Sequence, residues 1–257
     1  MWGSRALLIP ALLASSAGAQ WLKVPNAAIP RNPDGTPNLN APVPKTADGK
    51  PDLQGIWLSQ NTGLLLNLAG TGTNAVKVPF QPWAEKLFQE RIASRGIGDP
   101  EARCLPQGTP KMDVLPWPFK IIYAPGEVII LYETNNLWRQ VFIDGRALPR
   151  DANPTWLGYS VGHWDDDAFV IDSTGFTDNM WIDTNGHPHT DALHVVEKIR
   201  RPDFGHLAIE ITIDDPKAYT EPWTQTMRAR LLPDTDLLEF VCEERSMPHM
   251  VGPGPSR

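Results

Sequence analysis

Residues 156–201 read WLGYSVGHWDDDAFVIDSTGFTDNMWIDTNGHPHTDALHVVEKIRR, and this stretch indicates the fold class. Two runs of strand-forming residues, Tyr159–Trp164 and Ala168–Ser173, are separated only by three aspartates at 165–167. So short a polar connection predicts an antiparallel hairpin. A third run, Ala192–Arg201, follows a loop that is rich in histidine. The stretch therefore predicts three strands of a β domain, with a polar loop before the third.

The same pattern continues on both sides of this stretch. Short β-forming runs alternate with turn signals such as Pro-Gly, Asn-Asn and Asp-Gly. The further strands predicted in this way are 55–58, 119–124, 127–133, 137–143, 206–213, 223–231 and 237–244. Because many connections are short, consecutive strands should pair antiparallel. We expect a mainly all-β protein, folded as an antiparallel up-and-down β-barrel or a strongly curled sheet, with a two-sheet sandwich as the alternative.

The part of the chain before the main strands predicts an arm and one helix. Residues 20–52 are rich in Pro, Asn, Asp and Gly, which predicts an extended, mostly irregular arm. The arm contains a small repeat, DGTPNL and then DGKPDL, in which a glycine turn leads into an extended proline segment. An α-helix is expected at about 82–95, since Pro82 suits a first helical position and Gly96 suits a helix end. Residues 53–257 should then form a single barrel domain.

The first nineteen residues have the pattern of a signal peptide. Arg5 supplies the positive charge, a short apolar run follows, and Ala17-Gly18-Ala19 fits the small-residue rule for cleavage. We expect cleavage after Ala19 and a periplasmic or secreted location, with an uncleaved anchor as the alternative. No later segment has the ~20 apolar residues that a membrane helix needs.

Charge indicates which partners are disfavoured, and cysteine content predicts a disulfide. The formal net charge is −7 and no run of basic residues occurs, which disfavours nucleic acid and anionic membranes as partners. Two cysteines in an exported chain predict one disulfide, Cys104–Cys242, with two buried free thiols as the alternative. Oligomeric state has no signature in this sequence.

Four strands carry one charged residue on an otherwise apolar face. Alternation with period two places Glu133 with Ile129 and Leu131, and it groups Arg139, Asp172 and Glu197 with apolar residues in the same way. A lone buried charge costs several kcal/mol, so such groups must pair or reach water. We predict a buried ion pair between Arg139 and Glu197 and an interior polar site that includes Glu133 and Asp172. Exposure at strand ends is the alternative for the latter two residues.

The loop GHPHTDALH, residues 186–194, admits three interpretations. His187, His189 and His194 are possible zinc ligands. His189 or His194 is instead a candidate general base, oriented by Asp191 or Asp183. The third interpretation is a surface loop whose polar residues cap turns. No dinucleotide-binding, P-loop or nucleophile-elbow motif occurs, so no organic cofactor is expected, and zinc is the only alternative.

Aromatic residues are numerous among the predicted strands. Ten tryptophans are present, and core filling is the usual role of such rings. A barrel rich in these residues also suits a small apolar or aromatic ligand. The candidate ligand-binding residues are Tyr123, Tyr159, Trp138, Trp164, Trp181 and Asp172.

Two resemblances bear on the fold. The entry into the first strand, Gly55-Ile56-Trp57, resembles the Gly-x-Trp signature of lipocalin-like barrels. Over most of the mature length the chain is also similar to a family of exported bacterial proteins of unassigned function. The similar segments are ADGKPDLQGIW, IDGR, GHWDDDAFVIDSTGF, GHPHTDALHVVEKIRR and DDPKAYTEPW. The resemblance implies export and one barrel domain. The chain departs from that family's pattern at residues 165–167, where Glu-Gly-Asp is usual.

These observations favour an exported enzyme that performs proton-transfer chemistry on a small apolar or aromatic molecule in a barrel cavity, as a hydrolase, lyase or isomerase. Arg139 would stabilise negative charge, while Glu133 and Glu197 would hold Arg139 or act as acids. A carrier with the same barrel and no turnover is the alternative. A structural or surface interaction protein that uses the proline-rich arm is the third possibility.

Overall fold

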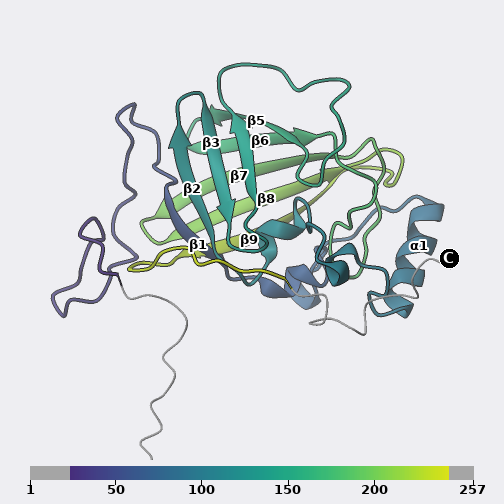
Figure 1. Ribbon diagram of the computed structural model, residues 1–257, viewed down its shortest axis with the longest axis horizontal. Coiled ribbons are helices and arrows are strands. Elements are labelled where there is room, and N and C mark those ends of the chain that lie inside the picture. The colour runs from purple at the N-terminus through teal and green to yellow at the C-terminus, as the bar shows by residue number, and fades with distance from the viewer. Residues whose placement is uncertain (1–23, 243–257) are drawn as a thin grey trace, which may run out of the picture.

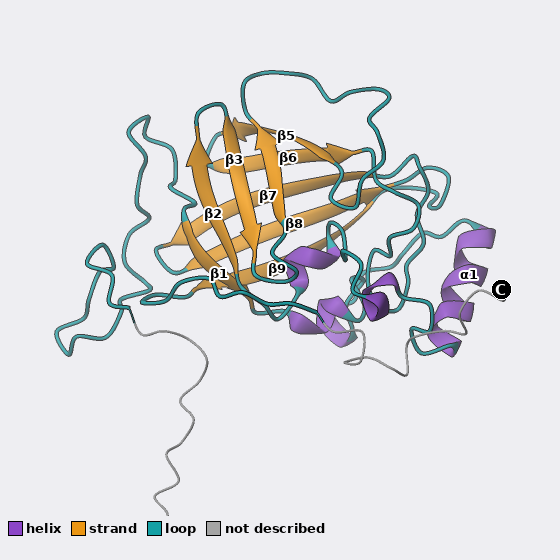
Figure 2. Ribbon diagram, viewed as in Figure 1, coloured by secondary structure: helices purple, strands orange, loops and turns teal. Residues whose placement is uncertain are grey.

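Nine strands, taken in sequence order, close into a β-barrel (Figures 1 and 2). The structure is a computed structural model, and it describes residues 24–242. The strands are β1 Gly55–Ser59, β2 Phe119–Ala124, β3 Glu127–Tyr132, β4 Trp138–Phe142, β5 Tyr159–Asp165, β6 Ala168–Thr174, β7 His194–Asp203, β8 His206–Asp214 and β9 Trp223–Leu231. The expected closed, mainly β architecture is confirmed, and the two-sheet alternative is not formed.

One neighbouring pair departs from the expected antiparallel pattern. Strands β4 and β5 run parallel, and only Val141↔Ser160 and Phe142↔Val161 are in register. All other neighbours, including the closing pair β1 and β9, are antiparallel. A closed ring needs an even number of antiparallel neighbours, so nine strands require a parallel pair. The reversal is made by residues 143–158, because a parallel connection must return the chain along the length of the barrel.

The prediction of a last strand at residues 237–244 is wrong. Residues 237–242 make a single parallel bridge, Phe240 to Thr134, in place of a strand. The bridge leaves the segment beside the start of β4, outside the barrel ladder. Residues 243 and 244 of that prediction lie outside the described residues, as does the expected signal peptide.

The helices lie at one end of the barrel, away from the loops of the arm (Figure 2). The expected α-helix is present as α1, Pro82–Ala93, and it buries Ala84 and Phe88 while Trp83 stays partly exposed. Four short 3₁₀ helices accompany it: η1 Thr62–Leu65, η2 Gly72–Asn74, η3 Pro100–Arg103 and η4 Lys111–Val114. All four residues of η4 are buried, so this segment belongs to the core.

Alternation along the strands fills the barrel with apolar side chains. In β9, every second residue from Trp223 to Leu231 is buried and each residue between them is exposed. At one barrel end Trp57 is fully buried, and the guanidinium carbon of Arg201 lies 5.0 Å from its ring centroid. Arg201 also donates to the carbonyl oxygens of Asp52 and Phe204, so it ties the arm and the β7–β8 turn to the barrel.

The described part of the arm, residues 24–52, loops out beside the barrel and then leads into β1 (Figure 1). Each repeat forms a tight turn that is closed by an isolated bridge, Arg31↔Pro37 in the first and Lys45↔Pro51 in the second. A leucine follows each turn. Leu39 packs against Gly205, and Leu53 is buried in the core. The repeat therefore attaches the arm to the barrel twice by the same local geometry.

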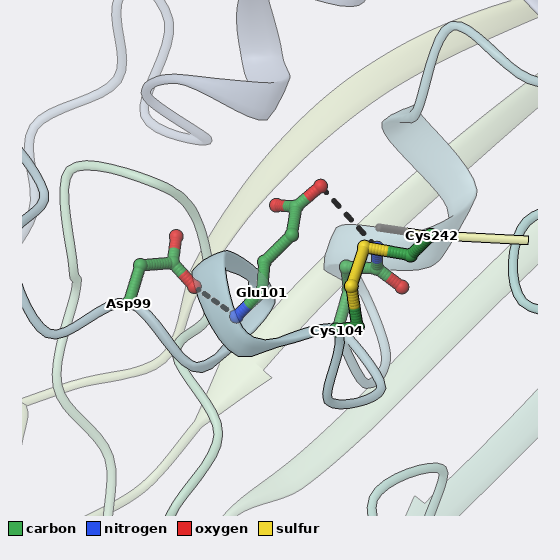
Figure 3. The surroundings of a disulfide bond; sticks show 5 residues. Asp99, Glu101, Cys104 and Cys242 are labelled. Carbon is green, nitrogen blue, oxygen red and sulfur yellow. Dashed lines mark hydrogen bonds between the residues drawn. A yellow bond between two sulfur atoms is a disulfide. The ribbon is translucent and has the colours of Figure 1, made fainter. Parts of the chain in front are cut away.

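The predicted disulfide is confirmed. Cys104 follows η3 and is bonded to Cys242, with their Cα atoms 5.5 Å apart (Figure 3). Close by, the Lys111 ammonium is buried between Asp99, at 2.5 Å, and Glu101, at 2.9 Å. The bond thus joins the end of the described chain to the helical end of the molecule. Within residues 24–242, no helix combines the length and apolar character that crossing a membrane requires.

Replacing both cysteines with alanine should lower the free energy of unfolding by about 4 to 5 kcal/mol in the chain-entropy description of a long closed loop. The bonded residues are separated by 138 positions. Urea denaturation of the oxidised protein and of the double variant measures the difference. Each single Cys→Ala variant should lose as much as the double variant, and equal stability of all forms would contradict the expectation.

Candidate functional site

The predicted ion pair between Arg139 and Glu197 is confirmed inside the barrel. Arg139 on β4 and Glu197 on β7 are each only 2% exposed, and an Nη2 hydrogen of the arginine is donated to Oε2 of the glutamate. Two hydroxyls complete this contact. Arg139 donates from Nε to Ser160 Oγ at 3.0 Å and from Nη2 to Ser173 Oγ at 2.7 Å. One guanidinium therefore connects β4 to β5, β6 and β7.

A second carboxyl group lies beside this pair. Asp113 of η4 is buried and accepts a hydrogen bond of 2.8 Å from the hydroxyl of Tyr132 on β3. Burial and, to a smaller extent, the nearby negative charge of Glu197 together raise the pKa of Asp113 to about 7. We call Arg139, Glu197, Asp113 and Tyr132 the ionic centre.

Two polar atoms of the ionic centre lack a partner in the described structure. They are Nη1 of Arg139 and Oδ2 of Asp113, both of them buried. A buried donor or acceptor without a partner costs about 1 to 3 kcal/mol, so such atoms mark a place for a bridging water or a bound polar group. This arrangement can hold or release a proton near neutral pH.

Glu133 and Asp172 do not belong to the ionic centre, which corrects the interior assignment of both. On β3 the interior residues are Val128, Ile130 and Tyr132, the opposite set from the one predicted. Glu133 lies beyond the strand, where Oε2 accepts a hydrogen bond from the backbone N–H of Leu238. The segment after β9 therefore buries Glu133 from outside.

Asp172 faces the outside of the barrel. On β6 the inward side chains are Phe169, Ile171 and Ser173, so the predicted register was off by one residue. The carboxylate of Asp172 contacts Nε2 of His194 at 3.1 Å, and His194 also lies on the outer face. The Ser173 hydroxyl accepts a hydrogen bond from the buried Arg139, which shows that Ser173, Ile171 and Phe169 share the face that points inward.

The histidine loop does not form the expected catalytic pair. Each ring nitrogen of His189 lies 3.0 Å from a backbone carbonyl oxygen, one of Thr190 and one of Met180. Asp191 is exposed and pairs with Lys217 instead. Burial lowers the pKa of His189. These contacts give His189 a role in holding the loop, and Asp191 does not orient it.

His187 pairs with the other aspartate that was considered. Its Nδ1 lies 2.5 Å from Oδ2 of Asp183, and both residues are almost fully buried. Asp183 also accepts backbone N–H groups of Leu68, Gly186 and His187, so the carboxylate organises the loop. The His187 ring packs against both Phe80 and Phe88, with centroids 5.5 and 4.0 Å away, and its Nε2 has no described partner.

The three histidines of the zinc alternative are separated by these contacts. His187 is bonded to Asp183, His189 to two carbonyl groups, and His194 to Asp172 on the outer face. Among the residues that the structure describes, no group of three or more His, Cys, Asp or Glu side chains is arranged to hold a metal ion.

The candidate ligand-binding residues divide between different places. Trp138 and Tyr159 lie together in a hollow of about 400 Å³ on the outer side of the barrel wall, where β4 meets β5. Tyr123, in contrast, accepts a hydrogen bond from the Leu53 N–H, and Trp164 packs on Phe169. Trp181 lies under the guanidinium of Arg91 in another hollow. The structure therefore brings two of these five aromatic residues together.

We call the hollow at β4 and β5 the aromatic groove. It is lined by Pro106, Leu137, Trp138, Arg139, Gln140, Phe142, Thr155, Trp156, Leu157, Gly158, Tyr159 and Ser160. Alternation on β4 turns Trp138 and Phe142 outward, and the Phe142 and Tyr159 rings pack with centroids 5.3 Å apart. Arg139 and Ser160 also line it, although their side chains turn to the interior. The groove therefore lies on the outer side of the wall behind which the ionic centre is buried.

Several residues of these sites were missed in the sequence. Asp113 lies in an irregular segment, where no periodicity reports its direction. Ser160 and Ser173 lie on strands, so extending the alternation from Phe169 and Ile171 would have placed Ser173 inside. Trp156 and Phe142 were counted only as core or strand residues.

Comparison with known proteins adds no assignment. No protein-family model matches the chain, and neither a curated protein nor a solved structure does. The expected resemblance to an exported family therefore stays a prediction, and the site must be interpreted from its own geometry.

The substitution Arg139→Met should lower the free energy of unfolding by about 3 to 5 kcal/mol, because it leaves the buried Glu197 carboxylate without its cation. Adding Glu197→Leu should recover part of this loss, since no isolated charge then remains. Urea denaturation of the wild type, both single variants and the double variant completes the cycle. Additive losses would show that the two groups do not depend on each other.

Asp113 should make the folded protein less stable as the pH rises from about 4 to about 7. Its pKa is about 7 in the folded protein but about 3.9 in an unfolded chain, so the folded state retains a proton that the unfolded state releases. Its contribution is complete below about pH 4 and is lost as the pH rises through about 7, at up to about 1.4 kcal/mol per pH unit.

The variant Asp113→Asn cannot ionise, and the stability difference between wild type and variant should therefore change across this range. Urea denaturation at a series of pH values measures it. Glu221→Gln, which alters an exposed carboxylate, is the matched control and should leave the profile unchanged. A constant difference between wild type and Asp113→Asn would refute the assignment.

Proposed function

We propose that the protein is an exported carrier that binds a small apolar or aromatic molecule in the aromatic groove. The observation that carries this proposal is the exposure of Trp138. Its side chain is 61% exposed, yet it stands on a regular strand and lines a hollow of about 400 Å³ with three other aromatic residues. Ligand pockets of this kind commonly have volumes of about 300 to 1,000 Å³ and mainly apolar walls.

The position of the groove supports binding. Strands β4 and β5 share only two residue pairs, so Trp138, Arg139 and Gln140 have no ladder partner on β5. The connection between these strands, residues 143–158, which we call the crossing segment, contributes Trp156 and Leu157 to the wall of the groove. Exposed apolar residues that gather in one concave place commonly mark an interaction site. A flat aromatic ring can therefore lie between the outward side of β4 and the crossing segment.

An oxidising compartment fits the disulfide. The bond between Cys104 and Cys242 is typical of proteins outside the cytosol, where thiols are not kept reduced. An exported carrier would keep this bond during its working life. The expected signal sequence at residues 1–19 supports the same location.

A second candidate function is proton-transfer catalysis on the same ligand, and the ionic centre favours it. Asp113 has a pKa of about 7 and a carboxylate oxygen without a partner. A general acid or base works best when its pKa lies near the operating pH. In this alternative Asp113 moves the proton and Arg139 stabilises negative charge, whereas His189 takes no part because both its ring nitrogens are engaged.

The two functions differ in one measurement. If Asp113 acts on the ligand, the protein should catalyse exchange of the ligand's hydrogens with deuterium from the solvent, followed by NMR. The substitution Asp113→Asn should then slow the exchange by roughly 10² to 10⁴ and leave the affinity nearly unchanged. Absence of exchange in the wild type would leave the carrier function alone.

The neutral dye N-phenyl-1-naphthylamine should bind in the groove, and Trp138→Ala should weaken its affinity about tenfold. Loss of one stacked ring corresponds to about 1 to 1.5 kcal/mol, which is near a factor of ten. Dye fluorescence titration measures the dissociation constant.

Trp83→Ala is the matched control for this experiment. Trp83 is also partly exposed, but it stands on α1, outside the groove. Its removal should change the affinity less than twofold. Equal effects of the two substitutions would place the dye elsewhere and overturn the proposed binding site.

A further inference from the structure

We infer that the ligand of the aromatic groove carries an anionic group, such as a carboxylate or a sulfonate, which binds at Arg91 and Arg103. This inference rests on the proposed function and specifies the class of ligand. Its basis is a second hollow of about 420 Å³ that borders the groove and has two guanidinium groups in its wall. We call it the arginine hollow.

The two hollows are neighbours. Trp156 lines both of them, and the consecutive residues Leu105 and Pro106 line one each. Their walls differ in character, because the groove is mainly aromatic and aliphatic whereas the second hollow contains charged and amide side chains. A molecule with a ring at one end and a charged group at the other would match both.

Arg91 is a half-buried cation without an acidic partner in residues 24–242. It extends from α1 over the Trp181 ring, with the guanidinium carbon 4.4 Å from the ring centroid. Nη1 donates a hydrogen bond of 3.0 Å to the carbonyl oxygen of Gly186, and the described ion pairs do not include this arginine. Burial lowers the pKa of Arg91, and the carboxylates of Asp99 and Asp183, which oppose this shift from a distance, are themselves paired with Lys111 and His187.

The stacking contact prepares Arg91 for a ligand. A guanidinium held over a ring has fewer conformations to lose, and its remaining N–H groups can donate in pairs to a carboxylate or sulfonate. An anion in the hollow would thus supply the missing counter-charge. A neutral ligand would leave the cation as it is.

Arg103 adds a second positive charge to the wall. It is the last residue of η3, it is exposed, and no ion pair within the described part of the chain involves it. The neighbouring Cys104 is held by the disulfide, so the backbone that carries Arg103 is anchored. Asp178 is the single acidic residue that lines the hollow, which leaves the two arginines in excess.

Another arginine near the groove is already neutralised. Arg146 donates a hydrogen bond to the Tyr159 hydroxyl, but its guanidinium also donates to both carboxylate oxygens of Asp144. Its charge is therefore compensated within the protein. Among the described residues that line the two hollows, the cations without an ion pair are Arg91 and Arg103, which is why the anionic end of the ligand is assigned to the second hollow.

Two matched fluorescent dyes test the inference. N-phenyl-1-naphthylamine is neutral, and 1-anilinonaphthalene-8-sulfonate has the same ring system with one sulfonate. The wild type should bind the sulfonate dye at least tenfold more tightly than the neutral dye. This preference should fall as the salt concentration is raised from about 20 to about 500 mM, because screening weakens a solvent-accessible charge pair.

The variants Arg91→Gln and Arg103→Gln should each weaken binding of the sulfonate dye about five- to tenfold and change the affinity for the neutral dye less than twofold. Arg91→Lys, which keeps the charge, should retain part of the preference. Arg230→Gln removes one exposed arginine of β9 and controls for net charge, so it should leave both affinities unchanged. If Arg91→Gln fails to fold, Arg103→Gln and the salt series carry the test.

The outcomes separate the two proposals. Equal affinity for both dyes, with no effect of either arginine, would overturn the inference while the aromatic groove remains as a binding site. Failure of the neutral dye to bind would overturn the proposed function itself. Loss of the preference in Arg230→Gln as well would assign it to overall charge and would also overturn the inference.

Discussion

Closure of a ring of nine strands is the constraint on which the rest of this structure depends. Antiparallel neighbours reverse direction, so an odd ring cannot close unless a pair runs parallel, and here that pair is β4 and β5. A parallel neighbour requires a long return connection. Residues 143–158 make that return, and they bring Trp156 and Leu157 to the outer side of the junction. The aromatic groove is thus a direct consequence of closure.

The same junction explains the ionic centre. Two residue pairs are a short ladder, so β4 and β5 hold each other weakly through their backbones. Arg139 compensates from inside, because its guanidinium reaches Ser160, Ser173 and Glu197 on the next three strands. A buried ion pair contributes little net stability compared with apolar packing, but removing one partner is costly. The centre therefore acts as a polar cross-link that holds this register of the wall.

The two sides of the wall suggest different chemistry for one ligand. Outside lie aromatic rings and, beyond Trp156, two arginines without described counter-ions. Inside lies a carboxyl group whose pKa is about 7, behind the backbone of Arg139 and Ser160. Binding needs only the outer face. The proposed catalysis would need a ligand to reach through the junction, whereas the proposed carrier function would not.

The sequence by itself determined the β architecture, the helix, the disulfide and the interior position of Arg139 and Glu197. Each of these follows from a local rule, such as alternation along a strand, proline at a helix start, or cysteine pairing. Alternation failed at Glu133 and Asp172, where one residue of register decides between core and surface. The histidine loop failed for a different reason, since Asp183, Thr190 and Met180 engage its imidazoles through contacts that no spacing reveals.

Tertiary structure alone decided the parallel pair, the groove and the residues that surround Asp113. The parity of a closed ring is a property of all nine strands together, so no single segment of the chain carries it. Asp113 and Arg91 lie outside the strands, and their surroundings come from residues distant in the sequence. Local periodicity reports which way a side chain points from its own strand. It does not report what the rest of the chain brings to meet that side chain, and this is where the candidate site is formed.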